Sequence, residues 1–486
     1  MYKAVTALVA VIVLGAAAPF AVGVLLERDA DARLKDALTA ASFVTVKERS
    51  YHRGWLQSEE VITLQLFVGL PGFSAAAAAG DKPALAPLLV TVRSAIDHGP
   101  LPGLAGLGLA RIDTRIAFGA AGGKPPSPDP RSPLKVETWL KLFGGGTATI
   151  RNVAFKDSEI ATGVMLSSDP INVTVRYGGH ADSIDTEASV PRLALATVEG
   201  SRIDATDFRW SGHSHRALRS IYTGNNVMSL AELSVGTTAA TPEAPPAADI
   251  KDLRYTATIA ASGEYVDLAG AISAATAHVA NSDLTQLKFD FAYRHVHMES
   301  LDHLIDGLRQ TQHEHGGNVA ALQADMAAQF KTYGVAILVH DPVLEFKDVE
   351  FALPQGAAKL TGAIRFKGAN ADDFKPPMRV QQLLAKVSVD FDLTMDDGLV
   401  EKLSGSVPPG PGPSPQAQQL QSLAEQGYIT RTDGKTRVKF AFVNGAVTLN
   451  GKPFSPAALQ PAPGAQPGRR PTPPLLTRPQ QQAPQR

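Results

Sequence analysis

The chain has 486 residues, of which 44% are hydrophobic and 19% are charged, and it contains no cysteine. Because 46 Lys and Arg balance 47 Asp and Glu, the formal net charge is -1, which leaves no basic field for nucleic acid. The absence of cysteine excludes disulfides, thiolate zinc sites and cysteine nucleophiles. The length allows two or three domains.

The first feature along the chain is an apolar run at residues 4–26, "AVTALVAVIVLGAAAPFAVGVLL". About 20 apolar residues suffice to cross a bilayer as a helix. The small residues at 16–18 are followed by Pro19 and more apolar residues, which is atypical of a cleaved signal peptide. Lys3 precedes the run and no positive excess follows it, so we expect an anchor with the rest of the chain outside the cytoplasm.

Alternation with a period of two dominates the chain up to residue 454 and predicts β-strands with one wet face. The clearest segments are 61–68, 110–118, 171–177, 344–353, 385–393 and 437–451. Helical patterns occur at 27–40, 298–310, 318–333 and 416–425. The Asn-Gly pair in "VNGAVTLNG" predicts a type I′ hairpin. The expected fold class is mainly β with some α (α+β), with an N-terminal transmembrane helix followed by an elongated, repeat-containing antiparallel sheet body.

Two segments of the C-terminal half resemble each other. "LKFDFAYRHVHMESLDHLIDGL" begins at Leu287 and "AKVSVDFDLTMDDGLVEKL" begins at Ala385, and each pairs a strand pattern with an acidic helix pattern. This predicts an internal repeat. We therefore divide the chain into an anchor at 1–26, a β-rich region at 27–282, a repeat-containing α+β region at 283–454, and a Pro- and Gln-rich tail at 455–486 that is too poor in apolar residues to fold.

The stretch "SYHRGWL" at residues 50–56 allows a structural and a catalytic interpretation. In the structural one, Gly54 after Arg53 permits a turn before a strand, and Tyr51 covers the end of the sheet. The catalytic one lacks a G-x-S-x-G nucleophile and a group that orients His52. We predict a structural motif.

The tripeptide His98-Gly99-Pro100 is interpreted in the same way. A strand pattern ends there, the glycine allows a turn, and the proline prevents further pairing. We predict that this tripeptide closes a corner of the sheet, and the alternative is that His98 acts as a ligand or a base.

Three His-x-His pairs are the strongest argument for chemistry: 213/215, 295/297 and 313/315. On a strand, residues two apart share a face and could share a metal. However, none forms H-E-x-x-H, and no carboxylate stands at the spacing that a metal site requires. Asp290, Asp390, Asp302 and Asp306 could form paired carboxylates, but a solvated face accounts for them. We predict no catalytic residue, no metal site and no cofactor.

The order of several pieces resembles the YdgA-like family of bacterial envelope proteins. An apolar anchor is followed by "YHRGWLQSEEVITLQL" from Tyr51, "IDHGPLPG" from Ile96, "YTGNNVMSLAELSV" from Tyr222, with Gly224 inside it, and "VNGAVTLNGKPF" from Val443. The resemblance implies a protein of uncharacterised function that is anchored in the inner membrane, and it supplies no catalytic residues.

The function predicted from the sequence is a single-pass inner-membrane protein whose periplasmic body acts without catalysis as a binding or structural component of the cell envelope. Its partners would be the inner membrane and a protein strand, a lipid chain or a polymer, and self-association is left open. The alternative is an envelope hydrolase that uses His and Asp residues, with or without a metal. Convergence of those residues in one pocket would favour the hydrolase.

Overall fold

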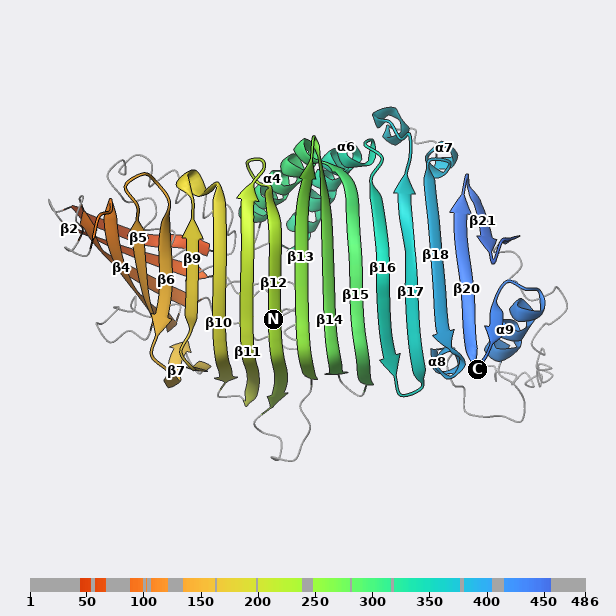
Figure 1. Cartoon of the computed structure of the whole chain (residues 1–486), viewed down its shortest axis with the longest axis horizontal. Coiled ribbons are helices and arrows are strands. Elements are labelled where there is room, and N and C mark those ends of the chain that lie inside the picture. The colour runs from red at the N-terminus through yellow and green to blue at the C-terminus, as the bar shows by residue number, and fades with distance from the viewer. Residues whose placement is uncertain are drawn as a thin grey trace, which may run out of the picture.

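The computed structural model describes residues 44–53, 57–66, 88–98, 102, 106–120, 134–161, 164–197, 200–237, 248–279, 282–315, 319–375, 380–403 and 415–455. Their strands join one antiparallel sheet, which twists from end to end (Figure 1). Every pair of neighbouring strands is antiparallel, so side chains alternate between two faces along each strand.

The N-terminal third of the sheet is built from short strands. In chain order they are β1 (Val44–Arg53), β2 (Gln57–Leu66), β3 (Leu88–His98), β4 (Ala110–Ala120), β5 (Leu134–Leu140), β6 (Gly146–Asn152), β7 (Phe155–Ala161), β8 (Val164–Ser168) and β9 (Asn172–Tyr177). The first six pair consecutively, and β9 pairs with β6. β10 (Ser183–Thr197) then pairs with both β9 and β8, and β7 pairs with β8.

The centre and the C-terminal part of the sheet follow in chain order. The central strands have 15 or 16 residues and are β10, β11 (Ser201–Arg216), β12 (Tyr222–Thr237), β13 (Ala248–Ser262), β14 (Tyr265–Val279) and β15 (Ser282–His297). After them come β16 (Val343–Leu353), β17 (Gly356–Phe366), β18 (Val387–Asp396) and β20 (Lys435–Val443). β19 (Thr430–Thr432) and β21 (Ala446–Leu449) both pair with β20, and β22 (Lys452–Pro453) pairs with β21.

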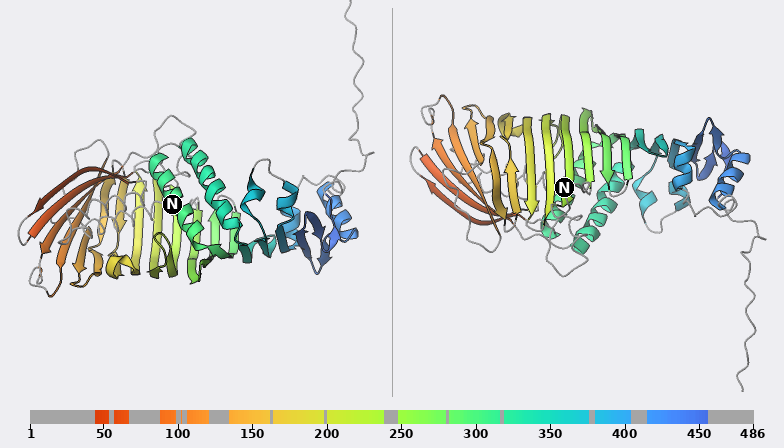
Figure 2. Two further views of the ribbon diagram at one scale, coloured as in Figure 1. Left: turned by 90° about the horizontal axis from the view of Figure 1, so that it is seen from above. Right: turned by 90° about the horizontal axis from the view of Figure 1, so that it is seen from below.

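A helical insertion separates β15 from β16. It consists of α4 (Met298–His315), α5 (Val319–Gln329), the π-helix η4 (Phe330–Gly334) and α6 (Val335–Leu338). Shorter helices are α7 (Val380–Leu384), α8 (Asp397–Leu403) and α9 (Pro415–Glu425), with 3-10 turns η3 (Gly179–Ala181) and η5 (Ala371–Phe374). Figure 2 shows that α4 and α5 lie on one side of the sheet and that the N-terminal strands curl toward that same side.

The side toward which the strands curl contains the two main cores. Inside the curl, side chains from β1 to β6 meet those of β9 and β10, among them Ile62, Val92 and Val173. Below the helices, Val266 and Val296 of the sheet pack against Leu304 of α4 and Ile337 of α6. We call this inner side of the sheet the apolar face and the opposite side the polar face.

The fold class predicted from the sequence is wrong. Instead of an α+β body of repeated modules behind a membrane helix, the described strands form one large antiparallel sheet. Within the described ranges, no helix is long and apolar enough to cross a membrane. The physical reason is that a separate module would end in a strand edge with unpaired backbone groups. In the single sheet the next strand along the chain pairs with that edge, as β16 does with β15.

Several local predictions are confirmed. Alternation at 110–118 and 344–353 corresponds to β4 and β16, and Asn444 and Gly445 have φ angles of 53° and 80°, as a type I′ turn requires. The helix expected at 318–333 ends at Gln329 and continues as a π-helix. The anchor at 4–26, the helix at 27–40 and the tail from 456 onward lie outside the described residues. Pairing of β14 with β15 runs across residue 282, and the domain division there stays a prediction.

Candidate binding surface

Strand register aligns one apolar side chain from each successive strand in a single line across the apolar face. The residues are Val136, Ile150, Val173, Ala188, Trp210, Met228, Tyr255, Ile272, Phe289, Val349, Leu360, Leu393 and Val438, from β5 to β20. We call this line the apolar row. Because neighbouring strands lie about 4.8 Å apart, the row is on the order of 55 Å long.

Two further lines run parallel to the apolar row over the C-terminal strands. One is Gly270, Phe291, Phe346, Gly362, Phe391, Phe440 and Leu449, and the other is Leu268, Tyr293, Leu344, Ile364, Val389, Phe442 and Val447. In the first, the rings of Phe346 and Phe391 have centroids 5.7 Å apart, although Gly362 of β17 lies between their strands. The rings of Phe391 and Phe440 follow at 6.4 Å. The surface is therefore apolar over a width of three rows.

Solvent exposure changes along the apolar row. Val136 and Ile150 are buried in the curl of the N-terminal strands. Ile272 and Phe289, which are register partners in β14 and β15, are 42% and 39% exposed. The apolar row is therefore buried at its N-terminal end and accessible to solvent in the middle of the sheet. Exposed contiguous apolar surface on a folded protein typically marks a site of interaction.

A cluster of aromatic rings lies where the helical insertion joins the sheet. His297 stacks on His340 with centroids 4.0 Å apart, and Tyr265 stacks on His295 at 3.8 Å. His295 Nδ1 lies 2.7 Å from the carbonyl oxygen of His340, and His297 Nδ1 lies 2.9 Å from Ser300 Oγ. Burial, followed by the neighbouring His297 and His295, lowers the pKa of His340. These contacts join the start of α4 to the end of α6 at one edge of the apolar face.

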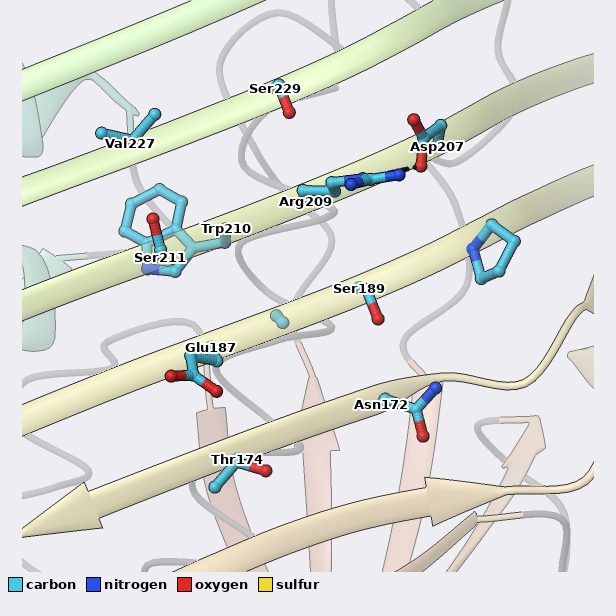
Figure 3. A pocket seen from close by; sticks show the side chains of 12 residues that line it. Asn172, Thr174, Glu187, Ser189, Asp207, Arg209, Trp210, Ser211, Val227 and Ser229 are labelled. Carbon is cyan, nitrogen blue, oxygen red and sulfur yellow. Dashed lines mark hydrogen bonds and ion pairs between the residues drawn. The ribbon is translucent and has the colours of Figure 1, made fainter.

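The polar face has a different character. A depression of about 640 Å³ lies over β9 to β12 (Figure 3). Many of its lining residues are short and polar, including Asn172, Thr174, Ser189, Ser211 and Ser229, and it is also lined by Ala188 and Trp210 of the apolar row and by the ion pair between Arg209 Nε and Asp207 Oδ1 at 2.9 Å. Such an open surface matches a solvated sheet face.

Further along the polar face, charged side chains alternate in sign from strand to strand. Asp348 of β16 accepts from Lys288 of β15 at 2.5 Å and lies 2.8 Å from Lys359 Nζ of β17. Hydrogen bonds from Lys288 and then from Lys359 lower the pKa of Asp348. On these strands, one face of the sheet is therefore charged and the other is apolar.

The residues of the "SYHRGWL" motif occupy the first hairpin. Tyr51 lies in β1 opposite Glu60 and packs against a buried cluster that includes Ile112 and Tyr177. Arg53, the last residue of β1, lies opposite Ser58. Gly54 lies outside the described residues, as do Gly99 and Pro100, and His98 is the last residue of β3.

Tyr222 and Gly224 stand at the start of β12. The Tyr222 hydroxyl accepts from Arg216 Nη2 at 2.7 Å and donates to the carbonyl oxygen of Ala181 at 3.3 Å. Gly224 has a φ of 139°, and a Cβ there would lie 1.9 Å from the carbonyl oxygen of His213. Both residues fix the corner between β11 and β12.

The structure does not gather the three histidine pairs and the four aspartates selected from the sequence at one place. His213 and His215 lie on the polar face of β11, whereas His295 and His297 lie at the end of β15. The third pair, at 313 and 315, belongs to α4.

The four aspartates are divided in the same way. Asp302 and Asp306 contact Ser220 from α4. Asp390 pairs with Arg365, and Asp290 lies opposite Asp348 in the register. In the part of the chain that is described, no group of three or more His, Asp or Glu residues is arranged to hold a metal.

The fold and this surface define a protein built as one long antiparallel sheet with an apolar and a polar face. The chain belongs to the family described as "Bacterial protein of unknown function (DUF945)", whose family model matches residues 1–457. The match shows a bacterial protein, and the narrower YdgA-like label is not confirmed by it. Comparison with curated proteins and with solved structures found no match.

Proposed function

We propose that this protein binds lipids of the bacterial cell envelope and holds their acyl chains along the apolar row. The observation that carries the proposal is the continuity of the row, which crosses the sheet without a charged side chain and has its exposed part at Ile272 and Phe289. Each methylene group transferred from water to such a surface gains about 0.8 kcal/mol. An acyl chain laid across the strands would bury its whole length.

The geometry favours a lipid chain over the other two ligands considered. A partner strand binds at the edge of a sheet through main-chain hydrogen bonds, and the apolar row lies on a face. A polar polymer requires convergent hydrogen-bonding groups, which the three apolar lines do not offer. Beyond the buried N-terminal end and Met228, the row continues from Tyr255 of β13 to Val438 of β20, about 30 Å at about 4.8 Å between strands, which is long enough for one extended acyl chain.

Binding, and not hydrolysis, is the activity that the described residues favour. The histidines and aspartates that could serve a hydrolase lie on opposite faces of the sheet and on α4. A hydrolytic site needs an acid, a base or a nucleophile within hydrogen-bonding reach of one substrate position. Under this proposal the protein carries or shields lipids and does not hydrolyse them.

We also propose that the protein acts at the inner membrane with its sheet in the periplasm. This location rests on the apolar run at residues 4–26 and the lack of a positive excess after it. A reporter enzyme fused after residue 455 should be active only when it is exported. Activity of a reporter that works only in the cytoplasm would contradict the location and would leave the lipid-binding proposal standing.

The lipid proposal is tested by native mass spectrometry of the purified chain. We expect lipid adducts on the wild type and their loss in Ile272→Asp, because a buried carboxylate on the row opposes an acyl chain. The matched control is Ser273→Asp, one residue along β14 and on the polar face, where Arg254 and Lys288 flank it in the register. Equal adducts in Ile272→Asp and the wild type would refute the proposal.

A further inference from the structure

The polar face holds a pair of imidazoles whose nitrogens converge. His213 Nε2 and His215 Nε2, two residues apart on β11, lie 2.9 Å from each other, and their ring centroids are 4.6 Å apart. Both side chains are exposed, and the His213 side chain has half of its area accessible. The pair lies on the face opposite the apolar row, so it is independent of lipid binding.

Asp185 of β10 fixes the orientation of the first imidazole. It is the register partner of His213, and its Oδ1 is hydrogen-bonded to His213 Nδ1. A carboxylate at Nδ1 keeps the proton on that nitrogen and leaves the Nε2 lone pair directed toward His215. Carboxylate–imidazole pairs of this kind commonly orient metal-binding histidines.

The two nitrogens lie close enough to bind the same metal ion. In the metal-free chain they are joined by a hydrogen bond of 2.9 Å. Two metal–nitrogen bonds of about 2.05 Å place their nitrogens about 2.9 to 3.3 Å apart for angles between about 90° and the tetrahedral angle. One ion can therefore replace the shared proton with little movement of either ring.

We propose that His213 and His215 chelate a divalent copper ion, with Asp185 as the positioning residue and water in the remaining coordination positions. Copper is chosen over nickel because its affinity for nitrogen ligands is the highest among the divalent first-row metals. The His295 and His297 pair does not offer the same site. Their rings stack on Tyr265 and His340, and each Nδ1 contacts a different oxygen.

The test is a titration of the metal-free full chain with CuCl₂, followed by calorimetry and by electron paramagnetic resonance. We expect one tightly bound Cu²⁺ with nitrogen hyperfine structure. His213→Ala and His215→Ala should each weaken the binding at least tenfold. Asp185→Asn should weaken it by about 10-fold, because second-shell partners of metal ligands contribute roughly 10- to 100-fold. Zn²⁺ should bind more weakly than Cu²⁺.

His278→Ala is the matched control. His278 also bonds a carboxylate through Nδ1, to Asp283 Oδ1 at 2.6 Å, but it lies on β14 without a histidine two residues away. It should bind Cu²⁺ as the wild type does. The proposal is overturned if the wild type takes up no stoichiometric copper, if His215→Ala binds as tightly as the wild type, or if the loss appears in His278→Ala instead. Circular dichroism of each variant confirms that a loss reflects the site and not unfolding.

Discussion

Gly270 of β14 lies directly under the ring of its register partner in β15, Phe291. A Cβ placed on Gly270 would be 2.8 Å from both Cε1 and Cζ of that ring. The glycine therefore makes room for the first aromatic ring of the line that continues through Phe346. A ring laid over a glycine also shields the backbone that the missing side chain would leave open.

This relationship predicts strong coupling between the two positions. Gly270→Ala should destabilise the protein by roughly 1–3 kcal/mol, because the ring must move off its place, and most of that loss should vanish in the background of Phe291→Ala. Chemical denaturation of the two single variants and the double variant measures the coupling. Additive losses would show that the ring does not restrict the glycine.

A second prediction concerns Gly224, whose φ is 139° and whose added Cβ would lie 1.9 Å from a carbonyl oxygen of β11. Gly224→Ala should destabilise the sheet by about 2 kcal/mol or more, since the strained conformation and the backbone clash add. Gly263→Ala is the control, because Gly263 also has a positive φ, of 62°, but open space around it. Its melting temperature should fall less. Equal decreases in melting temperature for the two variants would mean that the positive φ alone, and not the contact with the carbonyl oxygen, causes the loss of stability.

A third prediction follows from the lowered pKa of His340, which burial causes first and His297 and His295 reinforce, while Glu264 and Asp341 oppose it. The unfolded chain takes up a proton near pH 6.5, whereas the folded chain does so only at a lower pH. The unfolded state therefore binds more protons between these two values. Stability from this group is complete above about pH 6.5 and is lost as the pH falls through the folded pKa.

The variant His340→Phe keeps a ring against His297 and removes the titration. Its unfolding free energy should depend less on pH than that of the wild type between about pH 7 and pH 5. Denaturation at several pH values measures the two slopes. A variant with the same slope as the wild type would show that the ring cluster does not sense protons.

The sequence predicts many of the strands, but its pattern is weak for the long strands at the centre of the sheet. Alternation is clear in the segment that becomes β4, where Ile112 and Ile116 are buried and the residues adjacent to each in sequence are partly exposed. The long strands from β10 to β14 are less visible, because Ala, Ser, Thr and Gly occupy many of their positions. Residues with positive φ, such as Asp207 and Asp252, also interrupt the alternation within them.

The apolar row could not be predicted because it depends on register. Trp210 and Met228 are 18 residues apart in the chain and become neighbours only when β11 pairs with β12 (228 − 210). Phe289 and Val349 meet across the whole helical insertion. Each pairing is set by turns and bulges that a single sequence does not reveal.

The His213 site shows the same limit on a smaller scale. The spacing of two residues places His213 and His215 on one face of a strand, and the structure places them there. The carboxylate of Asp185 comes from the preceding strand, 28 residues earlier in the chain. A search for acidic residues at local metal-site spacings therefore cannot find it.

The most direct test of the lipid-binding account is photocrosslinking in living bacteria from a single position of the apolar row. A photoreactive amino acid in place of Ile272 should crosslink to lipid, and the same residue in place of Ser273, on the other face of β14, should not. Lipid is identified by mass spectrometry of the crosslinked peptide. Crosslinks from position 272 that contain lipid, with none from position 273, are the result that the account predicts. Crosslinks from position 272 that contain only protein, or equal lipid crosslinking from both positions, would contradict it.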